Sequence, residues 1–438
     1  MKIQKFGTAT LASADKIKAV AAILKEGGGD IAVLSSMQGT AEALTEISNY
    51  LYKKNQEGAN EIINRLELEY LNLSSVLFVK DEFRQKASGL ITAKFDYIRS
   101  FTKDLFTLFE ERIVLAQGEI LSTELVNLYL TENGLKTVYL YAPDFVRTDK
   151  NAVPDASYIK EKLTHLLSEN KDADVYITQG YICRNAYGEI DDLRKGGSDL
   201  SACLIGAAVG AKEIRIWADM DVMQNNDSRY VKGTKVIRQL NFHEAAELTY
   251  FGAKILHPSS ILPAKMANIP VRLMNTNCPD TEGTLISNET EPNTIKAVAA
   301  KDGITAIKIK SGRMLLAHGF LRRVFEVFEN YQTSIDMLAS SEVGISMTID
   351  NTKNLDNIVD DLKKYGTVSV DKGMVIIGIV GDLNWENTGF QSLIMEAVED
   401  VPVRMISYGG SNYNVSLLIK HEDKERALQL LNEKLFNK

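Results

Sequence analysis

The chain has 438 residues, more than one ordinary hydrophobic core organises, so we expect two or three domains. Hydrophobic residues make up 45% and charged residues 25%, a composition typical of a globular protein and without an apolar run long enough to cross a membrane. The net charge of -8 argues against nucleic acid and anionic membrane as partners, and any anionic substrate must therefore meet locally concentrated positive charge.

Strand and helix patterns alternate from the start of the chain. Residues 3–5 read as a strand rather than as part of a secretion signal. Apolar residues then recur at helical spacing between Ser13, a candidate N-cap, and the glycines at 27–29. The apolar run at 31–34 suits a buried parallel strand, and helical patterns fill most of residues 40–110.

Three further strands are expected at residues 137–140, 174–177 and 213–217, each flanked by helical stretches. This alternation predicts a largely parallel sheet with helices on both faces. Because ligands of such sheets bind beyond the carboxyl ends of the strands, we expect the functional residues there.

The pattern changes after a polar, proline-containing stretch at 288–293, which is typical of a linker. The elements become shorter and form two similar sets of the βαββα type, the second beginning at Met374. The expected elements are strands at 304–309, 333–338, 343–349, 375–380, 403–406 and 414–419, with helices at 319–331, after 349, after 380 and at the C-terminus.

A lysine and a glycine stand at the end of the first strand, in residues 5–8 (Lys-Phe-Gly-Thr). A glycine-containing turn from strand to helix can offer backbone N–H groups to a phosphate, and a lysine can meet the phosphate as a point charge. An ordinary turn that happens to contain these residues is the alternative.

A second glycine-bearing segment, residues 193–199 (Leu-Arg-Lys-Gly-Gly-Ser-Asp), precedes a helical pattern at 200–209. Paired glycines let the backbone approach a ligand closely, while Ser198 can cap the helix and Asp199 adds charge to its first turn. A plain loop and capped helix explain the segment equally well. Residues 178–181 also form a glycine-bearing loop after a strand, so both loops are expected to converge on one crevice.

Aspartates follow the strand at 213–217, in residues 217–221 (Trp-Ala-Asp-Met-Asp). They can hold Mg²⁺ through water or bind a nucleotide ribose, or they can form a solvated acidic loop. The pairs Gly118-Glu119 and Gly252 with Lys254 are uninformative by themselves.

Other chemistries have little support. The histidines are scattered, so no zinc site is expected, and neither a Gly-x-Ser-x-Gly elbow nor a Walker-type phosphate loop occurs. Cys183, Cys203 and Cys278 have no metal-ligand spacing and no disulfide framework. We therefore expect reduced thiols and a cytoplasmic protein.

Taken in this order, the segments resemble an aspartate kinase (aspartokinase) of the amino-acid-kinase superfamily, over nearly the whole chain. Residues 5–7 match the start of the family's Lys-Phe-Gly-Gly-Thr-Ser motif, and residues 196–199 match the core of its Gly-Arg-Gly-Gly-Ser-Asp loop. The most specific stretch is 251–258 (Phe-Gly-Ala-Lys-Ile-Leu-His-Pro). The other matching segments are 118–119, 178–182, 267–272, 275–276 and 283–286.

The C-terminal part resembles the tandem ACT domains of lysine-sensitive bacterial aspartokinases. Residues 319–321, 334–337 and 341–343 match the first ACT module, and 404–409 with Asn414 match the second. The resemblance implies an α/β fold, with a three-layer αβα amino-acid-kinase domain and two ferredoxin-like ACT domains. The implied boundaries are 1–287 for the kinase domain and 288–438 for the regulatory region, with ACT domains at about 303–373 and at 374–438, the latter completed by a strand near 294–300.

The implied reaction is phosphorylation of the side-chain carboxylate of L-aspartate by ATP with Mg²⁺, giving 4-phospho-L-aspartate, the first step of lysine, threonine and methionine biosynthesis. Aspartate's carboxylate has a pKa near ~4 and needs no general base at neutral pH. Lysine is the implied feedback inhibitor, and a homodimer through the ACT domains, or a tetramer, is the implied assembly. A kinase for a different amino acid, and a catalytically weak paralogue that senses an amino acid, remain alternatives.

The resemblance also implies roles for single residues, with no protein-derived metal site. The catalytic residues are Lys5, Asp199 and Lys254. The amino-acid substrate is assigned to Glu119, Lys195, Ala41 and Ser198. ATP is assigned to Gly7, Thr8, Gly196, Gly197, Ala218, Asp219, Asp227, Arg229 and Lys254. The effector is assigned to Met314, Phe320, Leu321, Ile335, Asp336, Ser341, Glu342 and Val343.

Departures from the family pattern gather on the substrate side. Thr8 stands where the family has glycine, and in a left-handed conformation it would carry about 1–2 kcal/mol of strain. Ala41 replaces a residue that contacts the substrate. Lys195 replaces an arginine and cannot form the same bidentate contact with a carboxylate, although Arg194 is adjacent. Ala317 replaces a serine of the effector site.

Overall fold

The structure, a computed structural model, describes residues 1–103, 105–194, 196–219, 223–251, 256–312 and 318–437. The chain divides into two units. The first contains Met1–Val222 and Ile255–Asn288, and the second contains Met223–Lys254 and Glu289–Lys438. Residues 223–251 thus pack with the C-terminal part, while the domain boundaries expected from the sequence stay a prediction.

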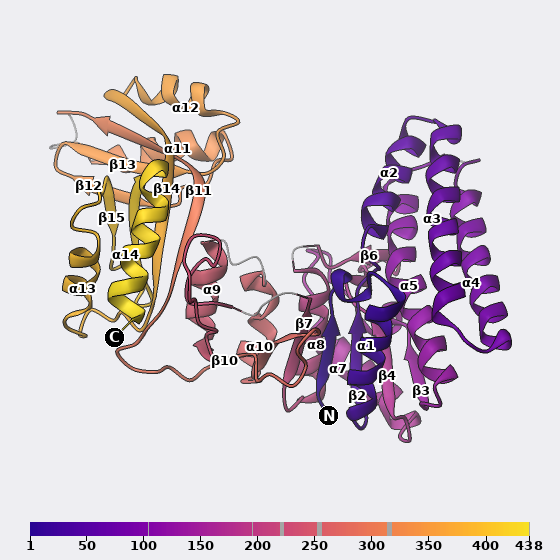
Figure 1. Ribbon diagram of the computed structural model, residues 1–438. Helices are drawn as coiled ribbons and strands as arrows, with labels where there is room; N and C mark the ends of the chain where they lie inside the picture. Colours follow the sequence, from indigo (N-terminus) through magenta and orange to yellow (C-terminus); the bar gives the residue numbers. More distant parts are fainter. Residues whose placement is uncertain (104, 195, 220–222, 252–255, 313–317, 438) are drawn as a thin grey trace. The chain divides into compact units, whose positions relative to one another are not determined.

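The first unit is built on a sheet in the order β3-β4-β2-β1-β7-β9-β10 (Figure 1). Pairing is parallel from β3 to β9, and only β10 runs antiparallel to β9. The mostly parallel sheet is therefore confirmed, and β1, β2, β3, β4 and β7 lie at the predicted places. The bounds are β1 Ile3–Phe6, β2 Asp30–Leu34, β3 Thr137–Leu140, β4 Val175–Gln179, β7 Ile214–Ala218, β9 Val271–Asn275 and β10 Thr284–Ser287.

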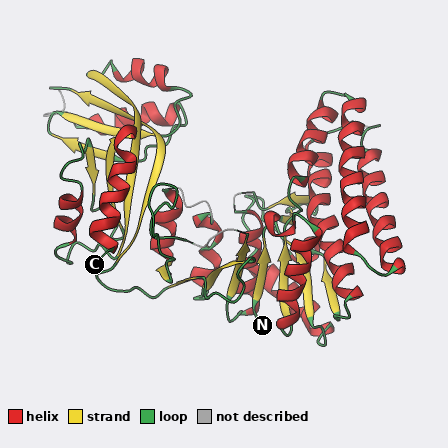
Figure 2. Ribbon diagram, viewed as in Figure 1, coloured by secondary structure: helices red, strands yellow, loops and turns green. Residues whose placement is uncertain are grey.

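Alternation along β1 separates the two faces of this sheet. Phe6 joins the apolar cluster of α1 and α5 on one face and stacks on Trp217 with the rings 5.9 Å apart. Ile3 lies toward α8 on the other face, where a side chain at Gly206 would collide with Ile214. Lys5 shares the face of Ile3 because side chains two apart on a strand point the same way. The result is the predicted three-layer αβα arrangement (Figure 2).

Helices α2 to α5 pack on one another beside this sheet, as the helical patterns at 40–110 predicted. Ser13 caps α1 as expected, with its hydroxyl accepting the N–H of Lys16, and Gly27 ends that helix. The helices of this unit are α1 Ala14–Glu26, α2 Thr40–Tyr52, α3 Gln56–Leu77, α4 Asp81–Ser100, α5 Leu108–Glu132, α6 Ala142–Phe145, α7 Ala156–Glu169, α8 Gly197–Val209 and α10 Leu262–Met266. In the part of the chain that the structure describes, no helix has the length and apolarity needed to span a membrane.

The second unit has an antiparallel sheet in the order β12-β13-β11-β14-β16-β15. Helices α11 and α12 cover one apolar core, and α13 and α14 cover another. The bounds are β8 Gln239–Asn241, α9 Phe242–Tyr250, β11 Ile295–Lys310, α11 Phe320–Asn330, β12 Leu338–Ser341, β13 Gly344–Ile349, α12 Leu355–Leu362, β14 Thr367–Gly381, α13 Phe390–Ala397, β15 Met405–Ser407, β16 Asn414–Lys420 and α14 Lys424–Phe436.

Two long strands run through both parts of this sheet. β11 pairs with β14 from Ile295 opposite Gly381 to Lys310 opposite Thr367, with register shifts between Lys301 and Ala306. The sequence predicted short strands here, because the break in register hides the continuity.

The strand predicted at 333–338 is wrong, since β12 begins only at Leu338. Asp336 and Met337 both pair with Thr348: the Asp336 N–H donates to the Thr348 carbonyl, the Thr348 N–H donates to the Met337 carbonyl, and the Met337 N–H donates to the Thr348 hydroxyl at 2.9 Å. Regular one-to-one pairing therefore starts only after this irregular step.

Candidate active site

A lysine and an aspartate meet at the carboxyl end of β1. The Nζ atom of Lys5 lies 2.7 Å from Oδ1 of Asp199, which stands in the first turn of α8. Their side chains are 12% and 16% exposed, so the ion pair is held largely out of water. An ammonium has three donors, and those not engaged with Asp199 can meet an anion at this edge of the sheet.

Two glycines lie where the start of α8 packs closely against neighbouring residues. A Cβ atom at Gly180 would lie 2.4 Å from Cβ of Ser198, and one at Gly196 would lie 2.6 Å from Oγ of Ser260. Gly196 has φ 104 and is the N-cap, so the expectation that Ser198 caps this helix is wrong. Instead, the Ser198 hydroxyl accepts a hydrogen bond from Ser35 at 2.9 Å. The N-terminus of α8 therefore presents backbone N–H groups and a positive dipole end beside Lys5.

The turn after β1 is a 3-10 helix, Thr8–Leu11. Gly7 has φ −78, and Thr8 is not among the described residues with positive φ, so the strain expected for a left-handed Thr8 is not present. A Cβ atom at Gly7 would lie 3.5 Å from Nζ of Lys5. The glycine thus keeps the space next to the lysine ammonium open.

Glu119 lies in α5 with 7% of its surface exposed. Burial raises the pKa of its carboxyl to about 7, although hydrogen bonds from the hydroxyl and backbone N–H of Ser36 oppose the rise, and the charge of Asp192 adds to it. Gly118 leaves room next to it, since a Cβ there would make tight contacts of 3.2 Å with side-chain carbons of Ser36 and Leu44. This buried carboxyl group is suited to receive a ligand cation that compensates its charge.

A hairpin of β5 (Ile182–Arg184) and β6 (Ile190–Asp192) carries two more carboxylates, those of Asp191 and Asp192. Arg112 of α5 pairs with Asp191 at 2.9 Å, and the next residue, Asp192, accepts a hydrogen bond from the Tyr181 hydroxyl. Sequence reasoning missed Arg112, and it included Tyr181 only as part of the loop at 178–181. The signal available for Arg112 was its position seven residues before Glu119, on the same face of one helix.

Backbone strain is concentrated around this hairpin. Tyr181 has φ 67 and Arg194 has φ 50, both in the left-handed region. The strained Tyr181 is held by a hydrogen bond from its N–H to the hydroxyl of Ser201 at 2.8 Å and by the N–H of Leu193 donating to its carbonyl at 2.9 Å. Such strain is typical of functional loops that the surrounding structure fixes in place.

Asp219 follows β7 and is bound by a residue that sequence reasoning missed. Lys16, in the first turns of α1, reaches Oδ2 of Asp219 at 2.8 Å and the carbonyl of Ala9 at 3.0 Å. The Asn277 side chain donates to the Asp219 carbonyl at 2.8 Å. The loops after β1, β7 and β9 are thereby tied together next to Ala218, at the predicted nucleotide site.

Ala41, one of the predicted substrate residues, lies in the first turn of α2. Ala41 is exposed near the start of α2, and Thr40 directs its hydroxyl to that of the buried Tyr70 at 2.7 Å. Lys195 and Lys254 lie outside the described residues.

Asp227 and Arg229, the remaining nucleotide assignments, belong to the second unit and form an ion pair with each other at 2.6 Å.

The predicted effector residues differ in exposure. Leu321 is 41% and Val343 50% exposed, whereas the Asp336 side chain is only 3% exposed and ion-paired with Lys301. Phe320 is buried and Ile335 half-buried, and Ser341 and Glu342 are exposed at the turn between β12 and β13. Met314 lies outside the described residues.

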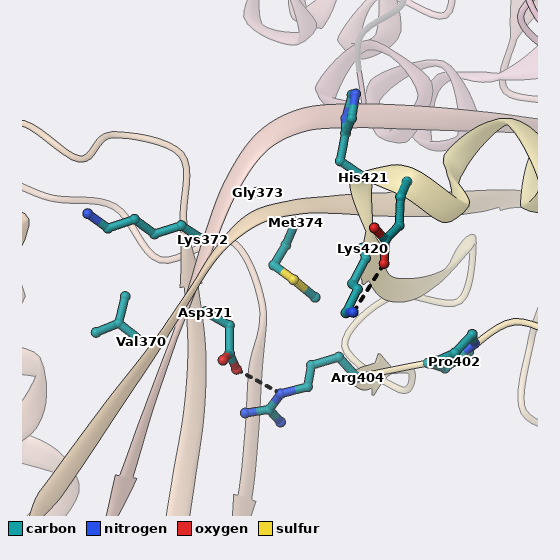
Figure 3. Close-up of a pocket in the computed structure, with 11 residues that line it drawn as sticks. Val370, Asp371, Lys372, Gly373, Met374, Pro402, Arg404, Lys420 and His421 are labelled. Atoms are coloured by element: carbon teal, nitrogen blue, oxygen red, sulfur yellow. Dashed lines mark hydrogen bonds and ion pairs between the residues drawn. The ribbon is translucent and has the colours of Figure 1, made fainter.

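A different hollow of about 800 Å³ opens in the second unit, where β14 passes beside the end of β16 (Figure 3). Four of its charged residues form two ion pairs, Asp371 with Arg404 at 3.0 Å and Lys420 with Glu422 at 3.1 Å. None of the predicted site residues lines it. Over the described ranges, no group of three or more His, Cys, Asp or Glu side chains is placed to hold a metal ion.

Two known protein families match parts of this sequence. The amino acid kinase family matches residues 1–275, and the ACT domain family matches residues 377–435. Together with the αβα fold and the glycine-lined site at α8, these matches show that the chain belongs to the amino acid kinase family.

Relatives define its place within that family. Aspartokinase 1, chloroplastic, of Arabidopsis thaliana is 32% identical over 469 residues, which cover 99% of this chain and 80% of that protein. Lysine-sensitive aspartokinase 3 of Escherichia coli (strain K12) is 29% identical over 450 residues, covering 99% of both. The chain is a member of the aspartokinases, as its sequence motifs predicted.

Solved structures agree over the full length. The crystal structure of E. coli aspartokinase III in complex with lysine and aspartate (T-state) superposes with a TM-score of 0.83 at 28% identity, covering 100% of this chain and 99% of that one. The complex of the same enzyme with aspartate and ADP (R-state) gives a TM-score of 0.78 at 27% identity, covering 100% of both chains. The predicted fold class is confirmed.

Proposed function

We propose that this chain transfers the γ-phosphoryl group of ATP to the side-chain carboxylate of L-aspartate, giving 4-phospho-L-aspartate. The observation that carries the proposal is the Lys5–Asp199 ion pair of 2.7 Å at the N-terminus of α8, next to the loop in which Ser35 binds Ser198 and Ser36 binds Glu119. The related structure that contains aspartate and ADP supports this choice of substrates.

The reaction needs positioning and charge neutralisation rather than a base. Aspartate's side chain is ionised at neutral pH, so its carboxylate oxygen is already a nucleophile. Lys5 neutralises oxygens of the transferred phosphoryl group, and Asp199 holds the Lys5 ammonium in place. The N–H groups at the start of α8, around Gly196 and Gly197, add a fixed positive field at the same point.

The amino-acid end of the site binds the substrate's ammonium. Glu119 is the primary acceptor, and Asp192 adds negative charge beside it. Lys195 supplies the cation for the α-carboxylate and Ser198 a hydroxyl, as the family resemblance implies, while Ala41 leaves room without a polar contact. This arrangement directs the side-chain carboxylate away from Glu119 and toward Lys5.

ATP enters with Mg²⁺, which neutralises phosphate charge as part of the substrate. We assign the nucleotide to Gly7, Thr8, Ala218 and Asp219, at the carboxyl ends of β1 and β7, with Lys254 as a second phosphate-neutralising lysine. Lys16 fixes the Asp219 carboxylate in this arrangement.

We further propose that free lysine is a feedback inhibitor, bound by the predicted effector residues of the second unit. The lysine-bound T-state structure of the E. coli relative supports this choice. The place of the reaction as the first step toward lysine, threonine and methionine, the homodimer or tetramer, and the cytoplasmic location remain predictions.

Trapping of the acyl phosphate tests the proposal directly. Purified protein with ATP, Mg²⁺ and hydroxylamine should give a hydroxamate with L-aspartate and much less with glutamate, asparagine or homoserine. An Asp199→Ala variant should give none, while its lysine binding by calorimetry stays intact. Equal hydroxamate from another amino acid, or an undiminished Asp199→Ala rate, would refute the assignment.

A further inference from the structure

A buried carboxylate in the second unit already holds a cation from its own chain. Oδ1 of Asp336 lies 2.9 Å from Nζ of Lys301 and accepts a hydrogen bond from the hydroxyl of Tyr250. Oδ2 is buried and has no hydrogen-bond partner among the described residues. Part of this carboxylate's capacity for hydrogen bonds is thus unused.

Lys301 reaches this point from an irregular place in β11, where the register with β14 shifts. Its ammonium also pairs with Asp350 at 2.9 Å and lies 4.2 Å from the centre of the Tyr250 ring. Burial lowers the pKa of Lys301, but the hydrogen bonds to Asp336 and Asp350 outweigh it and the net direction is upward. The ammonium is therefore charged at neutral pH and acts as an internal ligand of Asp336.

Tyr250 connects this cluster to α9, of which it is the last residue. The helix is docked on the same sheet at other points: His243 stacks on Tyr413 with ring centroids 5.0 Å apart, and Glu247 accepts a hydrogen bond from Asn414 at 3.2 Å. Tyr250 stands four positions before Lys254 in the sequence.

Space for a ligand group exists beside the carboxylate. A cavity of about 150 Å³ is lined by Asp336, Tyr250 and Glu247, together with Ser411 and Asn414. Two carboxylates and several neutral oxygen atoms favour a cation over an anion there. A small ammonium group that enters this cavity reaches the same carboxylate to which Lys301 and Tyr250 are bound.

We propose that Tyr250 and Lys301 are positioning residues that link an ammonium site at Asp336 to phosphoryl transfer. This inference rests on the proposed function and specifies how that reaction is regulated. While Lys301 occupies Asp336, the Tyr250 hydroxyl keeps its acceptor and the end of α9 is fixed. A free ammonium that takes Asp336 displaces Lys301, Tyr250 loses its acceptor, and the end of α9 is released.

A cluster that only stabilises the fold predicts a different result from one that transmits a signal. In the first case, removal of the Tyr250 hydroxyl lowers the stability of the folded protein. Inhibition is then unchanged when the same fraction of the Asp336 site is occupied by lysine. In the second case, binding and inhibition separate, because the ligand still reaches Asp336 but no longer changes α9. Coupling between two sites is typically worth a 5–150-fold change in affinity or activity.

The decisive variant is Tyr250→Phe, with lysine as the probe. We expect lysine binding by calorimetry to stay within about threefold of the parent protein, while the lysine concentration for half-inhibition of hydroxamate formation rises about tenfold or more. Tyr331→Phe is the matched control, since it removes a tyrosine–aspartate hydrogen bond of 2.9 Å to Asp361 in the same unit. That control should leave binding and inhibition unchanged.

Lys301→Met tests the internal competitor. We expect lysine to bind about tenfold more tightly, because the ammonium of free lysine no longer has to displace the ammonium of Lys301 from Asp336. Lys424→Met is the matched control, since Lys424 pairs with Asp302 at 2.6 Å and lies 4.5 Å from the centre of the Tyr230 ring. If Lys301→Met folds poorly, Lys301→Met combined with Asp336→Asn removes both charges and should lose lysine binding.

Inhibition of Tyr250→Phe at the parent lysine concentration would overturn the proposal, as would unchanged lysine affinity in Lys301→Met. Absence of lysine binding to both the parent protein and Lys301→Met would eliminate Asp336 as an ammonium site and overturn it as well. Hydroxamate formation from aspartate without lysine, measured in the same samples, tests the proposed function separately.

Discussion

Replacing Glu119 with glutamine should separate the stability of the kinase unit from its activity. Glu119 is 7% exposed in α5, and burial raises the pKa of its carboxyl to about 7. Below about pH 7, the folded protein without substrate therefore favours the protonated acid. Glutamine keeps the shape of that acid and cannot ionise, so Glu119→Gln should preserve the fold at every pH.

The sign of the pH dependence follows from the two pKa values. The pKa of Glu119 rises from 4.5 to about 7 on folding, so the folded state binds this proton more tightly than the unfolded state. The free energy of unfolding consequently falls as the pH rises from 4.5 through 7 and is constant above. The difference corresponds to about 3 kcal/mol, by which Glu119→Gln should exceed the parent protein at pH 8 and which should vanish near pH 4.5.

Activity should change in the opposite direction. The substrate's ammonium needs an ionised carboxylate, and a hydrogen bond to a charged group contributes about 1.5–3 kcal/mol. Glu119→Gln should therefore raise KM for aspartate about 10- to 150-fold, with a smaller effect on kcat. In the parent protein kcat/KM should rise through about pH 7, and the variant should lack that rise.

Both quantities can be measured on the same protein samples. Trp217 is 2% exposed in the kinase unit and Trp385 is 71% exposed in the second unit, so a Trp385→Phe background makes tryptophan emission report the kinase unit alone. Urea unfolding at pH 5 and pH 8 gives stability, and hydroxamate formation gives KM. A variant less stable than the parent at pH 8, or one with unchanged KM, would refute the roles derived for Glu119.

Three further variants test the remaining parts of the site. Lys5→Ala removes the cation 2.7 Å from Asp199 and should lower kcat about 10²- to 10³-fold in an ADP-release assay, whereas Lys18→Ala, whose partner is the exposed Asp15, should leave it unchanged. Tyr70→Phe leaves the buried hydroxyl of Thr40 without its 2.7 Å partner and should cost about 1–2 kcal/mol in urea unfolding; an unchanged midpoint would contradict that contact. Gly180→Ala places a Cβ 2.4 Å from that of Ser198, displaces the start of α8 and should lower kcat/KM about 10²-fold, while Gly89→Ala, in open space on α4, should not.

The sequence predicted those elements whose signals are local. β3 lies at residues 137–140 as predicted, and Ser13 caps α1, because an apolar run and a cap depend only on neighbouring residues. The length of β11 and β14 depends instead on pairing across the sheet. The start of β12 depends on the Thr348 side chain, which takes the N–H of Met337. Neither contact leaves a periodic trace in the sequence.

The site shows the same division between local and distant causes. Lys5 and Asp199 were both predicted as catalytic residues from motifs 194 positions apart, and the fold brings them to within 2.7 Å of each other. Lys16 was not predicted, since its contact with Asp219 arises only because β1 and β7 are neighbours in the sheet. The Ser198 cap was wrong because two left-handed glycines, Gly196 and Gly197, start α8 earlier than a serine cap would.

The distribution of charge resolves how a protein with a net charge of -8 can take anionic substrates. Positive charge is concentrated at one end of the site, in Lys5 and the N-terminus of α8, while Glu119 and Asp192 make the other end acidic. In the binding mode proposed above, aspartate enters with its ammonium toward Glu119, compensates the acidic end and brings its side-chain carboxylate toward Lys5. The reversed orientation sets carboxylate against carboxylate and leaves the ammonium beside Lys5. In the proposed mode these charges thus favour the orientation that reacts over the reversed one.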